Sequence, residues 1–135
     1  MSRRRKARQY ALQLLFRLDI TRENINWADF NEFWEDIQAT EDVISFAKEL
    51  VKGTWDNLER IDNEIRNSSS HWTLERINNV DRSLLRLAAF ELLYRNDIPA
   101  SVSINEALEI AKKFSSMESI SFINGILDNI AKKAV

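Results

Sequence analysis

The sequence predicts an all-α protein in which two small helical bundles pack into one domain. Apolar residues recur at intervals of three and four positions over most of the chain, which is the period of helices with a buried face. The 135 residues include only 2 Gly and 1 Pro, too few for the many turns of a hairpin-rich β fold. A chain of this length typically buries its own core, so residues 1–135 are expected to form a single domain.

The first helix is expected to be amphipathic and to end near Ile20. Its apolar positions follow the i, i+3, i+4, i+7 spacing that places side chains on one face. These positions are Ala7, Tyr10, Ala11, Leu14, Leu15 and Leu18.

Two further helices are expected in the N-terminal half. The first is short, with Asn26 as a candidate N-cap. Its inward-facing residues are expected to be Trp27, Phe30, Phe33, Trp34 and Ile37. The second is long, from about residue 41 to residue 66. Gly53 lies inside this long helix and is expected to let another helix approach closely.

The Asn-Ser-Ser-Ser run at residues 67–70 predicts a boundary between two subdomains, about 1–66 and 72–135. A short turn and three helices are expected after it. Their ranges are about 72–77 for the turn and 80–95, 103–114 and 119–133 for the helices. The first of these helices is apolar nearly all round, which predicts that it is central and buried. Ser103 and Glu106 have the spacing of a capping box that opens the next one.

The composition argues against an enzyme and against a bound metal or cofactor. The chain has no cysteine, which excludes disulfides, thiolate metal sites and a cysteine nucleophile. The single histidine, His71, excludes histidine-rich metal sites, and two isolated glycines do not form a phosphate-binding motif. No apolar run spans a membrane, and no signal-peptide pattern follows the basic N-terminus. We therefore expect a cytoplasmic, non-membrane protein with no catalytic residues, no cofactor and no metal.

The charge is distributed unevenly along the chain. The formal net charge is −2, but residues 1–22 carry a net +6 and the remainder a net −8. The basic residues cluster in one short run. They are Arg3, Arg4, Arg5, Lys6 and Arg8, with Arg17 and Arg22 further on. Such a run is either solvated or faces an anionic partner.

A helical wheel of the first helix places Arg5, Gln9, Leu12 and Phe16 opposite the apolar face, with Arg8 beside them. This pattern suits single-stranded RNA, because cations bind phosphates, an aromatic ring stacks on a base and Gln9 hydrogen-bonds base edges. The alternative is that the basic run is solvated and Phe16 packs against another helix. Exposed Leu12 and Phe16 leave both a monomer and a homodimer open.

Four segments resemble the NusB family. The most specific is Phe122–Asp128, with the sequence Phe-Ile-Asn-Gly-Ile-Leu-Asp. The segments Val80–Leu92 and Val102–Ala107 precede it in the family's order and at similar spacing, and the basic run resembles the family's arginine-rich first helix. The resemblance covers nearly the whole chain and is weakest over residues 24–67.

The resemblance implies a bacterial transcription antitermination factor with an all-helical fold of two bundles. Such a factor would recognise the boxA element of ribosomal RNA leader transcripts together with NusE, a small-subunit ribosomal protein, in a complex on RNA polymerase. The rival interpretation is a protein-only helical adaptor whose basic end docks an acidic partner helix, without sequence-specific RNA binding.

The resemblance also implies roles for individual residues. It assigns the cations from Arg3 to Arg8 to RNA phosphates and places Phe16, Glu118 and Phe122 along the RNA path. It places Glu75 and Asp81 on the surface that faces NusE. Met117 and Ile120 depart from the pattern, because more polar residues are expected there.

Overall fold

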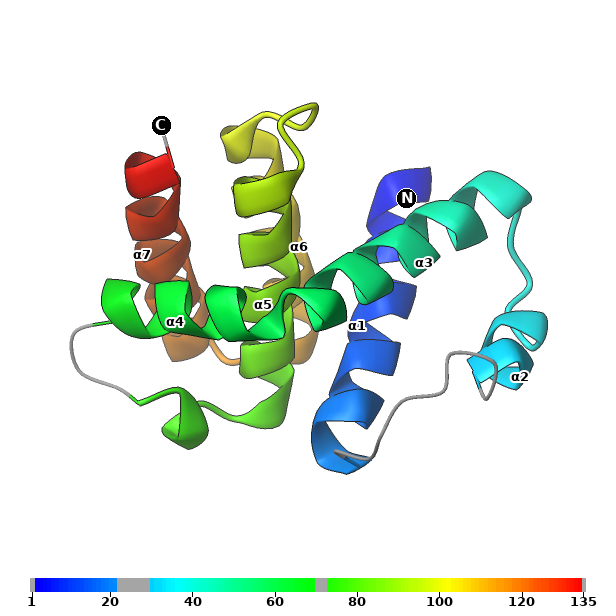
Figure 1. Ribbon diagram of the computed structural model, residues 1–135, viewed down its shortest axis with the longest axis horizontal. Helices are drawn as coiled ribbons and strands as arrows, with labels where there is room; N and C mark the ends of the chain where they lie inside the picture. The colour runs from blue at the N-terminus through cyan, green and yellow to red at the C-terminus, as the bar shows by residue number, and fades with distance from the viewer. Residues whose placement is uncertain (1, 22–29, 70–72, 135) are drawn as a thin grey trace.

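The computed structural model describes residues 2–21, 30–69 and 73–134, and within these ranges it contains α-helices, a short 3-10 helix and no β-strand (Figure 1). The all-α prediction is therefore confirmed. The elements are α1 (Arg3–Thr21), α2 (Asn31–Glu35), α3 (Glu41–Asp56), α4 (Leu58–Ser68), the 3-10 helix η2 (Leu74–Arg76), α5 (Asn79–Tyr94), α6 (Ala100–Phe114) and α7 (Met117–Ala134). None of the described helices is both long enough and apolar enough to cross a membrane.

Helix α5 is the centre of the fold, as its composition predicts. It contacts α1, α3, α4, α6 and α7, and every residue from Asp81 to Glu91 is buried. Helices α5, α6 and α7 stand side by side, while α1 and α3 pack together next to them with α2 at the edge (Figure 1). Burial on all sides follows from the apolar residues around the whole helix.

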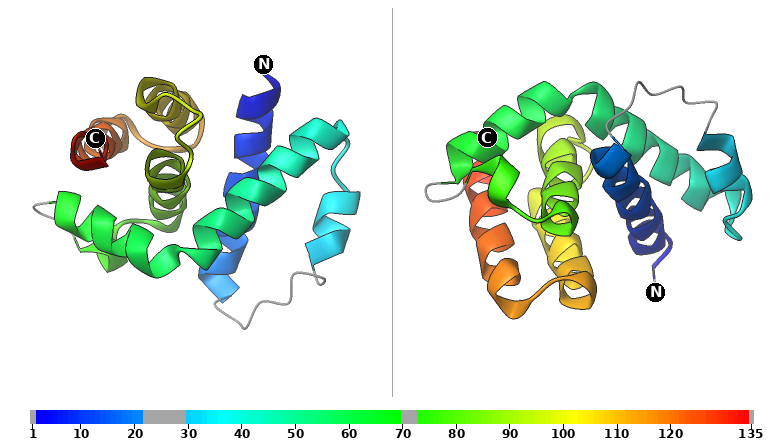
Figure 2. Two further views of the ribbon diagram at one scale, coloured as in Figure 1. Left: turned by 45° about the horizontal axis from the view of Figure 1, so that its top comes forward. Right: turned by 90° about the horizontal axis from the view of Figure 1, so that it is seen from below.

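The expected long helix over residues 41–66 is two helices in the structure. The chain leaves helical geometry at Asn57, whose φ is −116° and ψ is 24°. The Asn57 side chain competes with the backbone here, because its Nδ2 donates to the carbonyl oxygen of Gly53 at 2.7 Å. As a result α4 turns away from α3 and runs across α5 and α7 (Figure 2).

The division into subdomains of about 1–66 and 72–135 stays a prediction. Helix α4 lies on the N-terminal side of that boundary, yet it packs against α5 and α7 on the other side. The expected short helix is α2, in which Trp34 is buried. Its expected cap, Asn26, and Trp27 lie outside the described residues, as do His71 and Trp72.

Gly53 allows the close helix approach that the sequence predicts. A β-carbon at this position would lie 2.2 Å from Cζ of the Phe90 ring on α5. Contacts this short do not occur between real side chains, so a larger residue at this position would force the Phe90 ring or one of the two helices to move.

The predicted capping box at Ser103 and Glu106 is wrong. Helix α6 already begins at Ala100, after Pro99, so both residues lie inside the helix. Their side chains bond to other helices, because Ser103 Oγ donates to Glu91 Oε1 at 2.9 Å and Glu106 accepts from Arg5. Helix α7 begins at Met117, two residues before the expected start.

Candidate nucleic-acid interface

The basic run is helical from Arg3 onward, and three of its cations are paired with carboxylates on other helices. Arg3 Nη1 donates to Asp42 Oδ2 at 3.2 Å, and both side chains are exposed. Arg5 donates from Nε and Nη2 to the two Glu106 oxygens at 2.6 and 3.2 Å, in a partly buried bidentate pair. The solvated-run interpretation therefore does not describe Arg5.

Arg8 lies in the interior, which corrects its expected place on the RNA-facing side. Its side chain is only 3% exposed. Its Nε and Nη2 donate to the two Glu91 oxygens at 2.9 and 2.8 Å. A phosphate would have to break this buried pair to reach Arg8, at a cost of several kcal/mol. Arg8 is thus placed to hold α1 on α5.

Leu12 also lies inward, so the expected exposure of this residue is wrong. It is 5% exposed and belongs to the main core. The single-face wheel fails because α1 packs on α3 and α5 at once, which buries a wider arc than one apolar stripe. Gln9 and Phe16 are half-buried and remain on the open side of the helix.

Within the basic run, Arg4 and Lys6 are the exposed cations that form no ion pair with a carboxylate of the described residues. The guanidinium carbon of Arg4 lies 4.4 Å from the centre of the Phe46 ring on α3. That ring also attracts Arg95, whose guanidinium carbon lies 5.3 Å from its centre. Arg3 is also exposed and has a single, exposed ion pair. We call Arg3, Arg4 and Lys6 together the basic end of α1.

A second surface lies at the start of α5 and α7. A cavity of about 300 Å³ opens there, and Glu118 and Phe122 line it together, as expected for neighbours on one RNA path. The other lining residues are Arg76, Ile77, Asn78, Asp81, Ser116 and Ser119. We call it the Phe122 cavity. In Figure 1 the start of α1 lies at the upper side of the molecule and the starts of α5 and α7 lie at the lower side, so Glu118 and Phe122 lie apart from Arg3, Arg4 and Lys6.

Asp81 is not a surface residue, which corrects its expected place on a partner-facing surface. It is 3% exposed. Its carboxylate accepts from Asn78 Nδ2 at 2.9 Å and from Ser115 Oγ at the end of α6, while its N–H donates to Asn78 Oδ1 at 2.9 Å. These bonds cap α5 and join it to α6. A charge at the start of a helix is often expected to be exposed, but the Asp81 carboxylate is buried between the Asn78 cap and Ser115.

Glu75 is exposed, as a partner-facing residue must be. Its carboxylate accepts from Arg66 Nη2 at 3.1 Å. A hydrogen bond from its own backbone and the one from Arg66 hold the pKa of Glu75 below its ordinary value. Glu75 is therefore a charged group at neutral pH, and its role towards a partner stays a prediction.

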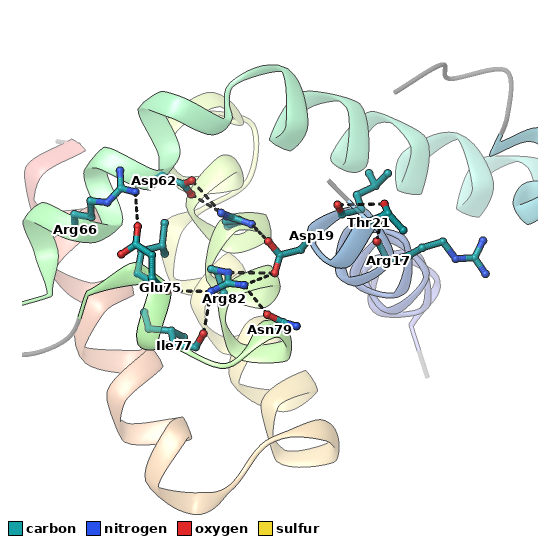
Figure 3. A network of polar contacts seen from close by, with 12 residues as sticks. Arg17, Asp19, Thr21, Asp62, Arg66, Glu75, Ile77, Asn79 and Arg82 are labelled. Carbon is teal, nitrogen blue, oxygen red and sulfur yellow. Dashed lines mark hydrogen bonds and ion pairs between the residues drawn. The ribbon is translucent and has the colours of Figure 1, made fainter. Parts of the chain in front are cut away.

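A buried ionic network that sequence reasoning did not find joins α1, α4 and α5 (Figure 3). Arg82 donates to Asp19 Oδ2 from Nη2 at 2.6 Å, and Arg86 donates to Asp19 Oδ1 at 2.8 Å and to both Asp62 oxygens at 2.8 and 3.0 Å. Burial alone would raise the pKa of Asp19, but the bonds from the two arginines outweigh it and lower that pKa. The sequence did contain one indication of this network. Arg82 and Arg86 are four residues apart in a helix that is apolar nearly all round, from which their burial and their need for acidic partners could have been inferred.

These observations describe a helical binding protein. It presents an exposed basic helix end and a cavity with an aromatic wall, and its described residues include no group of His, Cys, Asp and Glu side chains that could hold a metal ion. The NusB family model matches residues 5–132, so the chain belongs to the NusB family. This confirms the family that the sequence motifs indicate and, with it, a non-enzymatic factor.

Curated relatives are similar over nearly the whole chain. The transcription antitermination protein NusB of Thermodesulfovibrio yellowstonii is 42% identical, with 98% of this chain and 94% of the relative covered. The protein of the same name from Desulfitobacterium hafniense is 49% identical, with 96% and 88% covered.

Solved structures agree with the fold. NusB of T. maritima superposes with a TM-score of 0.83 at 36% identity, covering 98% of this chain and 92% of that one. A structure of the antitermination factors NusB and NusE in complex with dsRNA superposes with a TM-score of 0.85 at 30% identity, covering 98% of both chains.

Proposed function

We propose that this protein is an RNA-binding transcription antitermination factor that recognises boxA RNA of ribosomal RNA leaders together with NusE. The observation that carries the RNA part is the basic end of α1, where Arg3, Arg4 and Lys6 are exposed. Family membership and a structural neighbour described as a complex with NusE and RNA support the rest. The protein would act on the RNA polymerase elongation complex in the cytoplasm.

The proposed division of labour differs between the cations of the basic run. Arg3, Arg4 and Lys6 bind phosphates, whereas Arg5 and Arg8 position α1 through their pairs with Glu106 and Glu91. For single-stranded RNA, three phosphate contacts give a slope of about −2 in a plot of log affinity against log salt. Gln9, Phe16, Glu118 and Phe122 are the proposed contacts to bases and sugars.

The first test is a fluorescence-anisotropy titration of labelled boxA RNA and of a scrambled RNA of equal composition. It is run at several salt concentrations, with and without NusE. We expect tighter binding of boxA than of scrambled RNA, and a larger difference when NusE is present, because the RNA then contacts two proteins at once. Equal binding of both RNAs, unaffected by NusE, would contradict the proposal.

A pair of matched variants locates the site. The double change Arg3→Gln and Lys6→Gln removes two charges from the basic end of α1. The control, Lys52→Gln and Lys132→Gln, removes two exposed charges that are paired within α3 and within α7. We expect weaker RNA binding and a flatter salt slope for the first pair only.

The second candidate function is a protein-only adaptor. The observation that favours it is the exposed carboxylate of Glu75, which is available to a protein partner. The adaptor predicts that NusE binds equally well with and without RNA. A homodimer remains a prediction as well, although buried Leu12 no longer supports it. Size-exclusion chromatography over a range of protein concentrations tests the oligomeric state.

A further inference from the structure

Arg76 is an exposed arginine on η2 that the sequence motifs did not single out. It lines the Phe122 cavity. The charged residues on either side of it in the sequence are already engaged, because Glu75 accepts from Arg66, Asp81 accepts from Asn78 and Arg82 pairs with Asp19. Within the described residues, the side chain of Arg76 takes part in no hydrogen bond or ion pair, so its guanidinium is available to a ligand.

The backbone that carries Arg76 is held in place by the buried ionic network. Arg82 Nη1 donates to the carbonyl oxygens of Leu74 and Ile77 at 3.2 and 3.1 Å, on both sides of Arg76 (Figure 3). The side chains of Leu74 and Ile77 are buried, at 3% and 6% exposure. Since both flanking residues are anchored, Arg76 projects from a preorganised segment, and little order has to be gained on binding.

The cavity beside Arg76 has the chemistry of a nucleotide site. Phe122 supplies an aromatic ring. Ser116 and Ser119 bond to each other and Asn78 bonds to Asp81, and each of these side chains has further hydrogen-bonding capacity for a ligand. Glu118 supplies an acceptor for a base amine or a ribose hydroxyl. The carboxylate of Asp81 is already engaged by Asn78 and Ser115, so Arg76 and Glu118 are the charges that a ligand meets.

We propose that Arg76 is a phosphate-binding residue of the RNA path and receives the backbone of a nucleotide whose base lies against Phe122. Glu118 repels a phosphate and Arg76 attracts one, so the opposite charges orient the nucleotide, with its phosphate towards η2 and its base or sugar towards α7. A guanidinium fits a phosphate because it presents parallel N–H donors. This inference rests on the proposed function and adds a binding residue far from the basic end of α1.

The test compares Arg76→Gln with Arg60→Gln in RNA titrations at several salt concentrations. Arg60 is a matched control, since it is also exposed and without a carboxylate partner in the described residues, but it lies over Tyr94, away from the Phe122 cavity. We expect Arg76→Gln to bind RNA roughly fivefold more weakly, the effect of one screened surface charge. The salt slope should become about 0.7 shallower, as for one lost phosphate contact. Arg76→Lys should keep the wild-type slope, because the charge is retained.

Each outcome separates this inference from the proposed function. Failure of the wild-type protein to bind RNA would overturn both. Wild-type RNA binding with equal affinities and slopes for Arg76→Gln and Arg60→Gln would overturn the role of Arg76 alone. Loss of NusE binding in Arg76→Gln, with unchanged binding of RNA in the absence of NusE, would assign the residue to a protein contact and would also overturn the inference.

Discussion

Individual charged residues in this protein serve either the core or the surface, and the two uses are separated by burial. Asp19, Arg82 and Arg86 are buried and bonded to one another, whereas Arg3 and Asp42 form a single pair in solvent. A buried pair becomes costly when one partner is removed, because the other charge is left without compensation. An exposed pair contributes little, since water and salt screen it.

Asp19→Asn should therefore destabilise the fold strongly. The change leaves Arg82 and Arg86 short of a carboxylate in the core, with an expected loss of about 3 kcal/mol in the free energy of unfolding. Urea unfolding followed by circular dichroism measures it. The matched control is Asp42→Asn, which should cost less than about 1 kcal/mol. Similar losses for the two variants would contradict this interpretation.

The sequence indicated the residue types of the candidate site but not the partner that each side chain contacts in the fold. The positions of Arg3, Arg4 and Lys6 agree with the expected exposure, because a run of like charges at a helix end tends to face solvent. Arg8 and Asp81 do not, because their partners Glu91 and Ser115 come from distant parts of the chain. Periodicity reports the apolar face of a helix and carries no information about which charge a buried arginine will meet.

At the scale of elements, α3 and α5 pack closely at Gly53. The second glycine of the chain, Gly125, has open space around it and serves as the control for a prediction. Gly53→Ala places a β-carbon against the Phe90 ring and should cost about 1 to 3 kcal/mol in the free energy of unfolding. Gly125→Ala on α7 meets nothing within 4 Å and should stabilise by up to about 1 kcal/mol through helix propensity. Thermal unfolding of both variants measures the two effects. A change in the free energy of unfolding of the same sign in both variants would contradict the packing argument.

The turn between α5 and α6 gives a pH-dependent prediction. Arg95 donates from Nε and Nη2 to the two Asp97 oxygens, each at 2.9 Å, and this bonding lowers the pKa of Asp97 from 3.8 to about 2. Since the pKa is lower in the folded protein, the pair stabilises the turn above pH 3.8 and loses this effect as the pH falls towards 2. An NMR titration of the Asp97 carboxyl carbon checks it. In Arg95→Gln the midpoint should rise towards 3.8.

Element boundaries were predictable where the signal is local. The start of α5 was expected within one residue, because its apolar run begins there, whereas the cap at Asn78 was not predicted. The break at Asn57 was not expected, since the apolar stripe continues across it from α3 into α4. Ser103 and Glu106 formed a local capping pattern, but tertiary partners on α5 and α1 bind both side chains. Local patterns fail where a residue has a better partner elsewhere in the fold.

At the scale of the whole molecule, the candidate RNA residues lie in two groups on one body. The basic end of α1 carries Arg3, Arg4 and Lys6, whereas η2 and the start of α7, whose residues line the Phe122 cavity, lie towards the lower side of Figure 1, where α1 ends. The net charge of −2 hides this arrangement, because a mildly acidic body surrounds both groups. A single RNA strand has to run along the molecule to contact both.

This arrangement predicts that RNA affinity depends on strand length. Helix α1 has 19 residues and is about 28 Å long at about 1.5 Å per residue. A stacked strand advances about 3.4 Å per nucleotide, so a strand that follows the full length of α1 needs about eight nucleotides. Competition anisotropy with oligonucleotides of about 4, 8 and 12 nucleotides measures the dependence. We expect affinity to rise by at least about tenfold between the shortest and the longest, because the second contact becomes intramolecular. Lys6→Gln and Arg76→Gln should each lower the affinity for the longest RNA. A constant affinity over these lengths would show that only one group binds RNA and would leave the other group to protein contacts.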